Sequence, residues 1–256
     1  LMSVTRTFTV TVVSTDSGNK YFIDGVQQKT LNLIEGKTYE FDQSDSSNNT
    51  HPLRFSTTSD GTHSGGDEYT TGVTTNGTPG SSGAYTRITV AASAPTLYYY
   101  CTNHSGMGGL ANTLTSSVTR AYDVTVVSTG SGNKYFIDGV QQDTLYLGET
   151  GTYYFDQSAS SNNGHPFRFS TTSDGTHSGG DEYTTGVTTS GTPGQAGAYT
   201  QIVVADSAST LYYYCTNHSG MGGTANTPGG NTWGVFQWSQ NNWGSQDRVE
   251  VTLTGV

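Results

Sequence analysis

The chain has 256 residues, which is room for one large domain or two of ordinary size. Charged residues make up 12% of it and the net charge is −10, so it lacks the basic surface that nucleic-acid binding requires. No apolar run approaches the roughly 18 residues of a membrane-spanning helix. With 34 Gly, 17 Tyr and few bulky aliphatic residues, the composition favours short β-strands joined by many turns.

An internal repeat organises the chain. Residues 10–113 align with residues 124–227 at a constant offset of 114, and 86 of the 104 positions are identical. Each copy has the size of an ordinary domain, and residues 115–121 have the composition of a linker. We therefore expect two tandem domains and a distinct tail, with these bounds: 1–117, 118–228 and 229–256.

Within each copy, apolar side chains alternate with polar ones, which is the period of a β-strand. In the first copy this alternation predicts four strands, and an aromatic run predicts a fifth that is buried on both sides or aromatic on both faces: residues 8–12, 39–41, 53–55, 85–90 and 97–101. Turn pairs such as Asp24-Gly25 separate them. Six or seven short strands at this spacing predict an all-β fold, either a β-sandwich or a Greek-key barrel.

Sulfur-containing residues are concentrated in one motif per copy. Apart from Met2, every Cys and Met lies in Cys101-Thr-Asn-His104-Ser-Gly-Met107 or in its copy at residues 215–221. A further histidine, His51, begins a predicted strand upstream. One thiolate, two imidazoles and a thioether are the ligands of blue-copper sites, in which Met is a weak axial ligand. The motif therefore predicts a copper site, in which a tight loop returns His and Met to the Cys at the strand end.

This pattern resembles the cupredoxins, and the ligand loop is most similar to the amicyanin or plastocyanin type. The resemblance implies two tandem cupredoxin-like Greek-key β-sandwich domains that could each hold copper. The ligands that it implies are His51, Cys101, His104 and Met107 in the first domain and His165, Cys215, His218 and Met221 in the second. Blue-copper loops of this length are commonly stiffened by proline. This chain has Asn103, Ser105 and Gly106 there, which predicts a looser loop.

The same residues also have a purely structural interpretation. A buried Cys at a strand end is commonly a small apolar residue, Met107 could pack in the core, and the histidines could bond loop carbonyls. A second polar loop, residues 60–68, could bind a hard cation through its carboxylates or could simply hold turns. No disulfide is expected between Cys101 and Cys215, because interior sites of two domains would have to meet.

The tail is unlike the repeats. It carries Trp233, Trp238 and Trp243 at five-residue intervals, and an alternating closing strand follows. Tryptophan supplies a large buried area and is enriched at interface anchors. These three residues are therefore predicted to dock the chain onto a partner or onto another copy of itself.

Two strings, HP-x-RFSTTSDGTHSGGDEYTTGVTT and YYYCTNHSGMGG, resemble repeats in virion proteins of marine cyanophages and their relatives. The resemblance implies a non-enzymatic virion structural protein, such as a fibre, decoration or neck/tail appendage component, in the virion or outside the cell. Its partners would be other virion proteins, identical subunits or the host cell surface. This prediction includes no enzymatic activity, because no nucleophile elbow, P-loop or dinucleotide fingerprint is present.

Two alternatives rest on the metal motif. The chain could be a type 1 copper-binding electron-transfer protein. Copper could also act only as a staple, since a metal that binds the folded state alone stabilises it by mass action.

Overall fold

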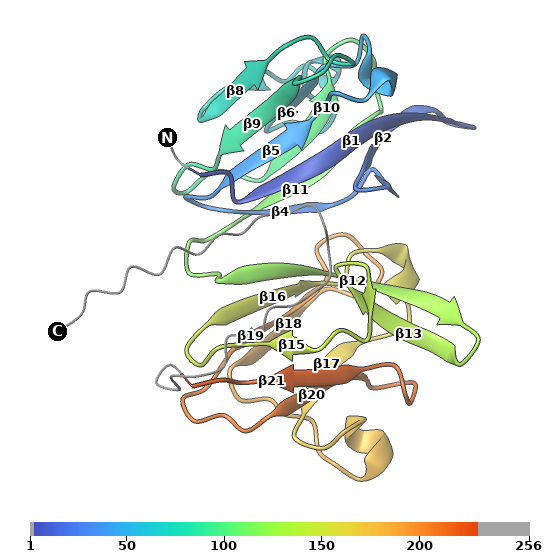
Figure 1. Ribbon diagram of the computed structural model, residues 1–256, viewed down its shortest axis with the longest axis vertical. Coiled ribbons are helices and arrows are strands. Elements are labelled where there is room, and N and C mark those ends of the chain that lie inside the picture. Colours follow the sequence, from blue (N-terminus) through green and yellow to red (C-terminus); the bar gives the residue numbers. More distant parts are fainter. Residues whose placement is uncertain (1–2, 230–256) are drawn as a thin grey trace, which may run out of the picture. The chain divides into compact units, whose positions relative to one another are not determined.

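The computed structural model describes residues 3–229, which form two compact units that divide between Thr113 and Leu114. Each unit consists of two β-sheets packed face to face, and the helical segments are short 3₁₀ turns (Figure 1). The predicted all-β class is confirmed. Among residues 3–229, none of the helices is long and apolar enough to span a membrane.

Unit 1 has one sheet with strand order β3-β2-β1-β5-β9-β8 and a second with order β4-β11-β10-β6-β7. Its strands are β1 (Arg6–Thr15), β2 (Gly18–Ile23), β3 (Val26–Gln27), β4 (Leu31–Ile34), β5 (Thr38–Asp42), β6 (Leu53–Ser56), β7 (Glu68–Tyr69), β8 (Val73–Asn76), β9 (Tyr85–Thr89), β10 (Leu97–Cys101) and β11 (Gly109–Leu114). Its 3₁₀ helices are η1 (Ser46–Asn48) and η2 (Gly61–Ser64).

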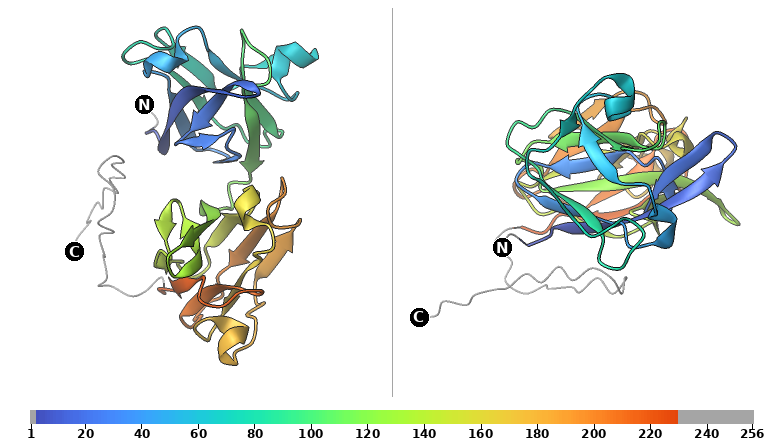
Figure 2. Two further views of the ribbon diagram at one scale, coloured as in Figure 1. Left: turned by 90° about the vertical axis from the view of Figure 1, so that its right-hand side faces the viewer. Right: turned by 90° about the horizontal axis from the view of Figure 1, so that it is seen from above.

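Unit 2 repeats this arrangement, with orders β14-β13-β12-β16-β19-β18 and β15-β21-β20-β17. Its strands are β12 (Arg120–Thr129), β13 (Gly132–Ile137), β14 (Val140–Gln141), β15 (Leu145–Tyr146), β16 (Thr152–Asp156), β17 (Phe167–Ser170), β18 (Val187–Ser190), β19 (Tyr199–Val203), β20 (Leu211–Cys215) and β21 (Gly223–Asn226). Its 3₁₀ helices are η3 (Ser160–Asn162) and η4 (Gly175–Ser178). Figure 2 shows the elements of both units from two further directions.

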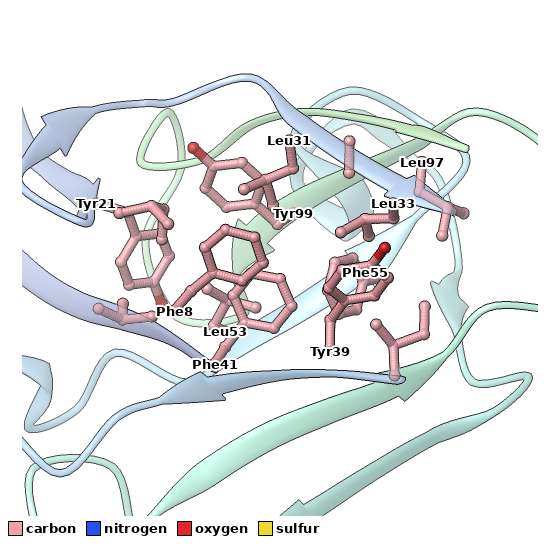
Figure 3. Packing of buried hydrophobic residues seen from close by; sticks show 14 of the residues in the cluster. Phe8, Tyr21, Leu31, Leu33, Tyr39, Phe41, Leu53, Phe55, Leu97 and Tyr99 are labelled. Carbon is pink, nitrogen blue, oxygen red and sulfur yellow. The ribbon is translucent and has the colours of Figure 1, made fainter. Parts of the chain in front are cut away.

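The core of unit 1 lies between its sheets and is rich in aromatic rings. In β1, Phe8 and Val10 are buried whereas the intervening threonines are exposed, which is the period of two that the sequence shows. β1 runs parallel to β5 with Phe8 opposite Phe41, and their rings stack with centroids 5.1 Å apart. Side chains of both sheets meet in this layer (Figure 3). Aromatic rings thus supply the buried area that the scarce aliphatic residues cannot.

The five strands predicted for the first copy correspond to β1, β5, β6, β9 and β10, but the unit has more strands than predicted. Some of the additional strands, such as β3 and β8, leave both faces partly or fully exposed, so their alternation is weak in the sequence. The predicted linker overlaps β12, which begins at Arg120. The predicted docking residues Trp233, Trp238 and Trp243 and the closing strand lie outside the described residues.

One strand pair positions the candidate metal ligands. β6 and β10 are antiparallel, with Cys101 opposite Leu53. Antiparallel strands run in opposite directions, so the start of one lies beside the end of the other. The residues before β6 and those after β10 therefore lie at the same end of the sheet. His51 precedes β6 by two residues and His104 follows β10 by three, so the register brings the upstream histidine to the ligand loop.

Candidate metal centre

Three of the four predicted ligands of unit 1 converge. The Cys101 Sγ lies 3.8 Å from His51 Nδ1 and 3.7 Å from His104 Nδ1. The two imidazole rings have centroids 4.6 Å apart. The thiol can donate to one ring nitrogen while its sulfur accepts from the other, so the two contacts fit hydrogen bonds in the metal-free cluster as well as a shared metal ion.

Unit 2 reproduces this arrangement. Cys215 Sγ lies 3.8 Å from His165 Nδ1 and 3.7 Å from His218 Nδ1. Among the described residues, these two triads are the groups of His, Cys, Asp and Glu side chains whose ligand atoms lie within 4.8 Å of one another. The described part of the chain thus contains two three-donor clusters, one in each unit.

The spacing of the donor atoms fits a trigonal metal site. Bonds of about 2.3 Å to a thiolate and about 2.0–2.1 Å to an imidazole, at about 120° to one another, place sulfur and nitrogen about 3.8 Å apart. A tetrahedral angle would bring them to about 3.5–3.6 Å for the same bond lengths. In the structure these distances are 3.7 and 3.8 Å, short enough for one metal ion to bind all three donors. A trigonal His₂Cys set with a weak fourth ligand is typical of blue copper, whereas structural zinc takes four strong ligands in a tetrahedron.

The fourth predicted ligand is placed in the core. Met107 is fully buried, and it belongs to the hydrophobic cluster that also contains Cys101. Its backbone carbonyl accepts a hydrogen bond from the Tyr21 N–H at 2.9 Å. Met221 has the same environment in unit 2, beside Cys215 and Tyr135. Met107 and Met221 are therefore core residues at the end of the ligand loop that share a hydrophobic cluster with the cysteine.

Buried hydrogen bonds fix the backbone at His51. Its carbonyl accepts from the Tyr21 hydroxyl at 2.7 Å and from the Gln43 amide at 2.8 Å. The Gln43 side-chain oxygen accepts in turn from the Leu53 N–H at 3.1 Å. Gln43 thereby spans Pro52, which has no N–H of its own and keeps His51 extended. One buried side chain thus connects the histidine ligand to the start of β6.

The two imidazoles of the cluster differ in exposure. His51 is 7% exposed, whereas His104 is exposed at the surface. Burial, and secondarily the neighbouring His104, lowers the pKa of His51 below the ordinary value for histidine. A lowered pKa keeps the ring neutral to a more acidic pH, and the neutral ring is the form that binds a metal. Unit 2 shows the same direction and causes at His165.

The ligand loop, residues 102–108, is held from several sides without proline. The Gly106 N–H donates to Asp60 Oδ1 at 2.9 Å, and the Gly106 carbonyl accepts from Lys20 Nζ at 2.6 Å. Gln28 Nε2 donates to the Gly108 carbonyl at 2.5 Å, and Asn103 Nδ2 donates to the Thr50 carbonyl at 2.9 Å. The prediction of a looser loop is therefore wrong, because hydrogen bonds from side chains of other segments restrain the loop backbone in place of proline. We call Lys20, Gln28 and Asp60 the loop clamp.

Removing one member of the loop clamp should weaken metal binding. Asp60→Gly removes the acceptor of the Gly106 N–H and tolerates the left-handed backbone at this position, where φ is 59°. Loss of an outer partner of a metal ligand typically costs 10–100-fold in affinity, and we expect a loss of about this size. A competition titration of Cu(II) against a chelator, in a His218→Ala background with one intact cluster, measures it.

Asp60→Asn is the matched control for this variant. Its side-chain oxygen still accepts a hydrogen bond, and Asn also adopts the left-handed conformation readily. Its affinity for copper should stay close to that of the parent. Equal losses for the Gly and Asn variants would show that the acceptor does not hold the loop.

The polar loop at residues 60–68 bonds both the ligand loop and the end of β10. Asp60 is a member of the loop clamp, and Glu68 pairs with Arg54 at 3.3 Å. His63 Nε2 lies 2.8 Å from the Cys101 carbonyl oxygen, at the end of β10. The loop also covers Tyr100, since a Cβ on Gly61 would lie 2.6 Å from its ring. Its hydrogen bonds hold both turns and the metal cluster, so the turn-holding interpretation is the better one.

The predicted ligand residues did not include the outer residues of the site, although the sequence carried a signal for them. Lys20, Tyr21 and Gln28 all lie in the string SGNKYFIDGVQQ, which is identical in the two copies. Their counterparts Lys134 and Gln142 make the same bonds in unit 2, at 2.6 and 2.5 Å. The identity of this string in the two copies could have indicated that it has a role in the site. No sequence motif connects it to the ligand loop, however, because Lys20 and Gly106 are 86 residues apart in the chain.

The structure resembles solved copper enzymes, at low sequence identity. A multi-copper oxidase from Pseudomonas thermotolerans matches 90% of this chain and 65% of its own, at 10% identity and a TM-score of 0.40. The multicopper oxidase mgLAC matches 92% and 89%, at 13% identity and a TM-score of 0.35. Fet3p, a multicopper oxidase that functions in iron import, matches 94% and 55%, at 12% identity and a TM-score of 0.34. This chain thus spans less than two thirds of the first of these proteins. No protein-family model and no curated protein matches its sequence.

Each unit is a β-sandwich of two sheets, in agreement with the predicted all-β fold class. The solved structures are enzymes, and this contradicts two predictions from the sequence: a non-enzymatic virion structural protein, and the absence of enzymatic activity. The virion prediction rested on the resemblance of two sequence strings to virion repeats, and the prediction of no enzymatic activity rested on the absence of three sequence motifs. Neither argument used the convergence of donor atoms in the fold.

Proposed function

We propose that the chain binds copper at both His₂Cys clusters as type 1 centres and acts in one-electron transfer. The observation that carries the proposal is the position of each Cys Sγ, within 3.7–3.8 Å of two imidazole nitrogens in both units. The thiolate, the two imidazoles and the buried thioether supply the soft and borderline ligands that copper prefers in both oxidation states. Bound copper would supply a centre that gains and loses one electron.

The protein residues divide the remaining tasks. The buried cysteine and methionine keep water from the sulfur side of the cluster, and the loop clamp keeps the donors in place when the charge of the site changes. His104 is the exposed ligand, so its ring offers the shortest path between the cluster and a redox partner at the surface. Because electron transfer weakens steeply with distance, we expect electrons to enter and leave at His104 and at its counterpart His218.

Visible absorption of the purified protein, before and after addition of Cu(II), tests the proposal. A thiolate bound to Cu(II) in a trigonal site gives an intense blue band, and two equivalents of copper should be needed to saturate it. The double variant His104→Ala and His218→Ala, with both loops otherwise intact, should lack the band. A parent protein that stays colourless with excess Cu(II) would refute the assignment.

Oxygen uptake by the same samples separates a carrier from an oxidase. The copper-loaded protein is supplied with a phenolic reductant and air, and reduction without sustained consumption of oxygen would assign it to the carriers. Steady uptake that the double His variant lacks would assign the copper to an oxidase instead.

A further inference from the structure

The two clusters share their ligands and their loop clamps, so a difference between them has to come from elsewhere. Asp174 accepts from Gly220 at 2.9 Å and Lys134 donates to it at 2.6 Å, the same distances as in unit 1. The sulfur–nitrogen distances are also the same. The two copies differ at 18 of the 104 aligned positions, and at positions outside this window such as Thr9 and Asp123; differences of this kind can make the centres unequal.

One of these positions directly follows a residue of the loop clamp in the sequence, and its charge is reversed between the units. Lys29 in unit 1 corresponds to Asp143 in unit 2. The preceding residue, Gln28 or Gln142, is a member of the loop clamp. The backbone carbonyl at this position accepts from a core tyrosine, Tyr99 at 2.9 Å in unit 1. Tyr99 precedes Cys101 by two residues, so position 29 is connected both to the ligand loop and to the cysteine strand.

The local charge changes sign between the units. Lys29 lies 4.0 Å from Asp24, which also pairs with Arg6 at 3.0 Å, so this group carries a net charge of +1. In unit 2, Arg120 pairs with Asp138 at 3.0 Å, and both also interact with Asp143, so the net charge is −1. The Lys29 side chain is only 12% exposed. Burial also raises the pKa of Asp143. Water therefore screens these charges less than charges on the open surface.

The charge summed over each unit differs with the same sign, and one exchange acts in the opposite direction: Ala159 replaces Asp45, the N-cap of the 3₁₀ helix that precedes His51. Residues 1–113 carry nine acidic and six basic residues, and residues 114–229 carry nine and three, so unit 2 is also more negative as a whole. Leu53, opposite Cys101, is replaced by Phe167, opposite Cys215. Both side chains and both cysteines are fully buried, so the exchange alters packing without admitting water to the sulfur. Charge is the factor that separates the two sites.

We propose that Lys29 and Asp143 give the two centres unequal reduction potentials, the higher one in unit 1. The inference rests on the proposed function. When a site takes one electron from a reductant, Cu(II) becomes Cu(I) and the positive charge of the site falls by one. Negative surroundings favour the oxidised state and positive surroundings the reduced state. The centre of unit 1 is therefore reduced first and oxidised last, and the chain stores its first electron there.

Redox titrations of two single-centre proteins test this inference. His218→Ala leaves the centre of unit 1 and His104→Ala leaves that of unit 2, and the blue band reports the oxidation state of each. The centre of unit 1 should be reduced at the higher potential. Lys29→Asp should lower the potential of unit 1, and Asp143→Lys should raise that of unit 2. Lys37→Asp, the same charge reversal at an exposed position of unit 1, should shift the potential less.

The outcomes distinguish the two proposals. If neither single-centre protein develops a blue band with Cu(II), the proposed function fails and the inference fails with it. If both are blue but have the same potential, or if unit 2 has the higher one, the inference alone is overturned. It is also overturned if Lys29→Asp and Lys37→Asp shift the potential equally.

Discussion

Replacing Cys101 and Cys215 by serine is expected to abolish the blue band of the copper-loaded protein. The affinity for copper should fall by more than about 100-fold, because the loss of a residue that only supports a ligand already costs up to about that much. The thiolate is the one anionic donor of each cluster, and a serine hydroxyl stays protonated at neutral pH. The two imidazoles that remain are neutral and bind copper weakly without it. Absorption spectra and a chelator competition titration measure both effects.

The fold should survive these substitutions. Both cysteines are free and fully buried, and serine is slightly smaller, so the expected loss of unfolding free energy is about 1–2 kcal/mol per site. Thermal unfolding of the metal-free protein serves as the control. A serine double variant that still turned blue with Cu(II) would show that the band does not come from these thiolates.

Gly222→Ala is expected to cause the largest loss of stability, more than about 4 kcal/mol for unit 2. A Cβ at this position would lie 1.7 Å from the Tyr213 carbonyl oxygen and 2.6 Å from the carbonyl carbon. Both are backbone atoms of β20, next to the strand end that carries Cys215, so no side-chain rotation relieves the collision. The ligand loop would have to move away from the strand, and the copper centre of unit 2 would be lost with it.

Gly130→Ala is the matched control in the same unit. A Cβ there has no neighbour within 4 Å, so its effect should stay within about 0.5 kcal/mol. Chemical unfolding of both variants, monitored by far-ultraviolet circular dichroism of the backbone, compares their stabilities. Similar midpoints for the Gly222 and Gly130 variants would mean that the loop can leave β20 at little cost, and that its close packing does not hold the ligands.

The fold class and the ligand triads could be predicted from the sequence because both depend on local pattern. Alternation in residues 8–12 or 85–90 is set by the two faces of a half-buried strand. The triad was found because Cys and Met are rare here and gather in one short motif, residues 101–107. Among the extra strands, β8 and β11 were not predicted because their own alternation is weak, whereas β2 and β4 alternate over only about three residues each.

The tertiary structure decided how the site is held and where its charges lie. Lys20 and Asp60 belong to different segments and bond the same glycine from opposite sides, which no local pattern encodes. The exchange of Lys29 for Asp143 is visible in the sequence, but its meaning depends on the fold, which connects that position to the ligand loop and to the cysteine strand. Residue types fix which donors and charges are available, whereas strand register and loop packing fix the distances through which they act.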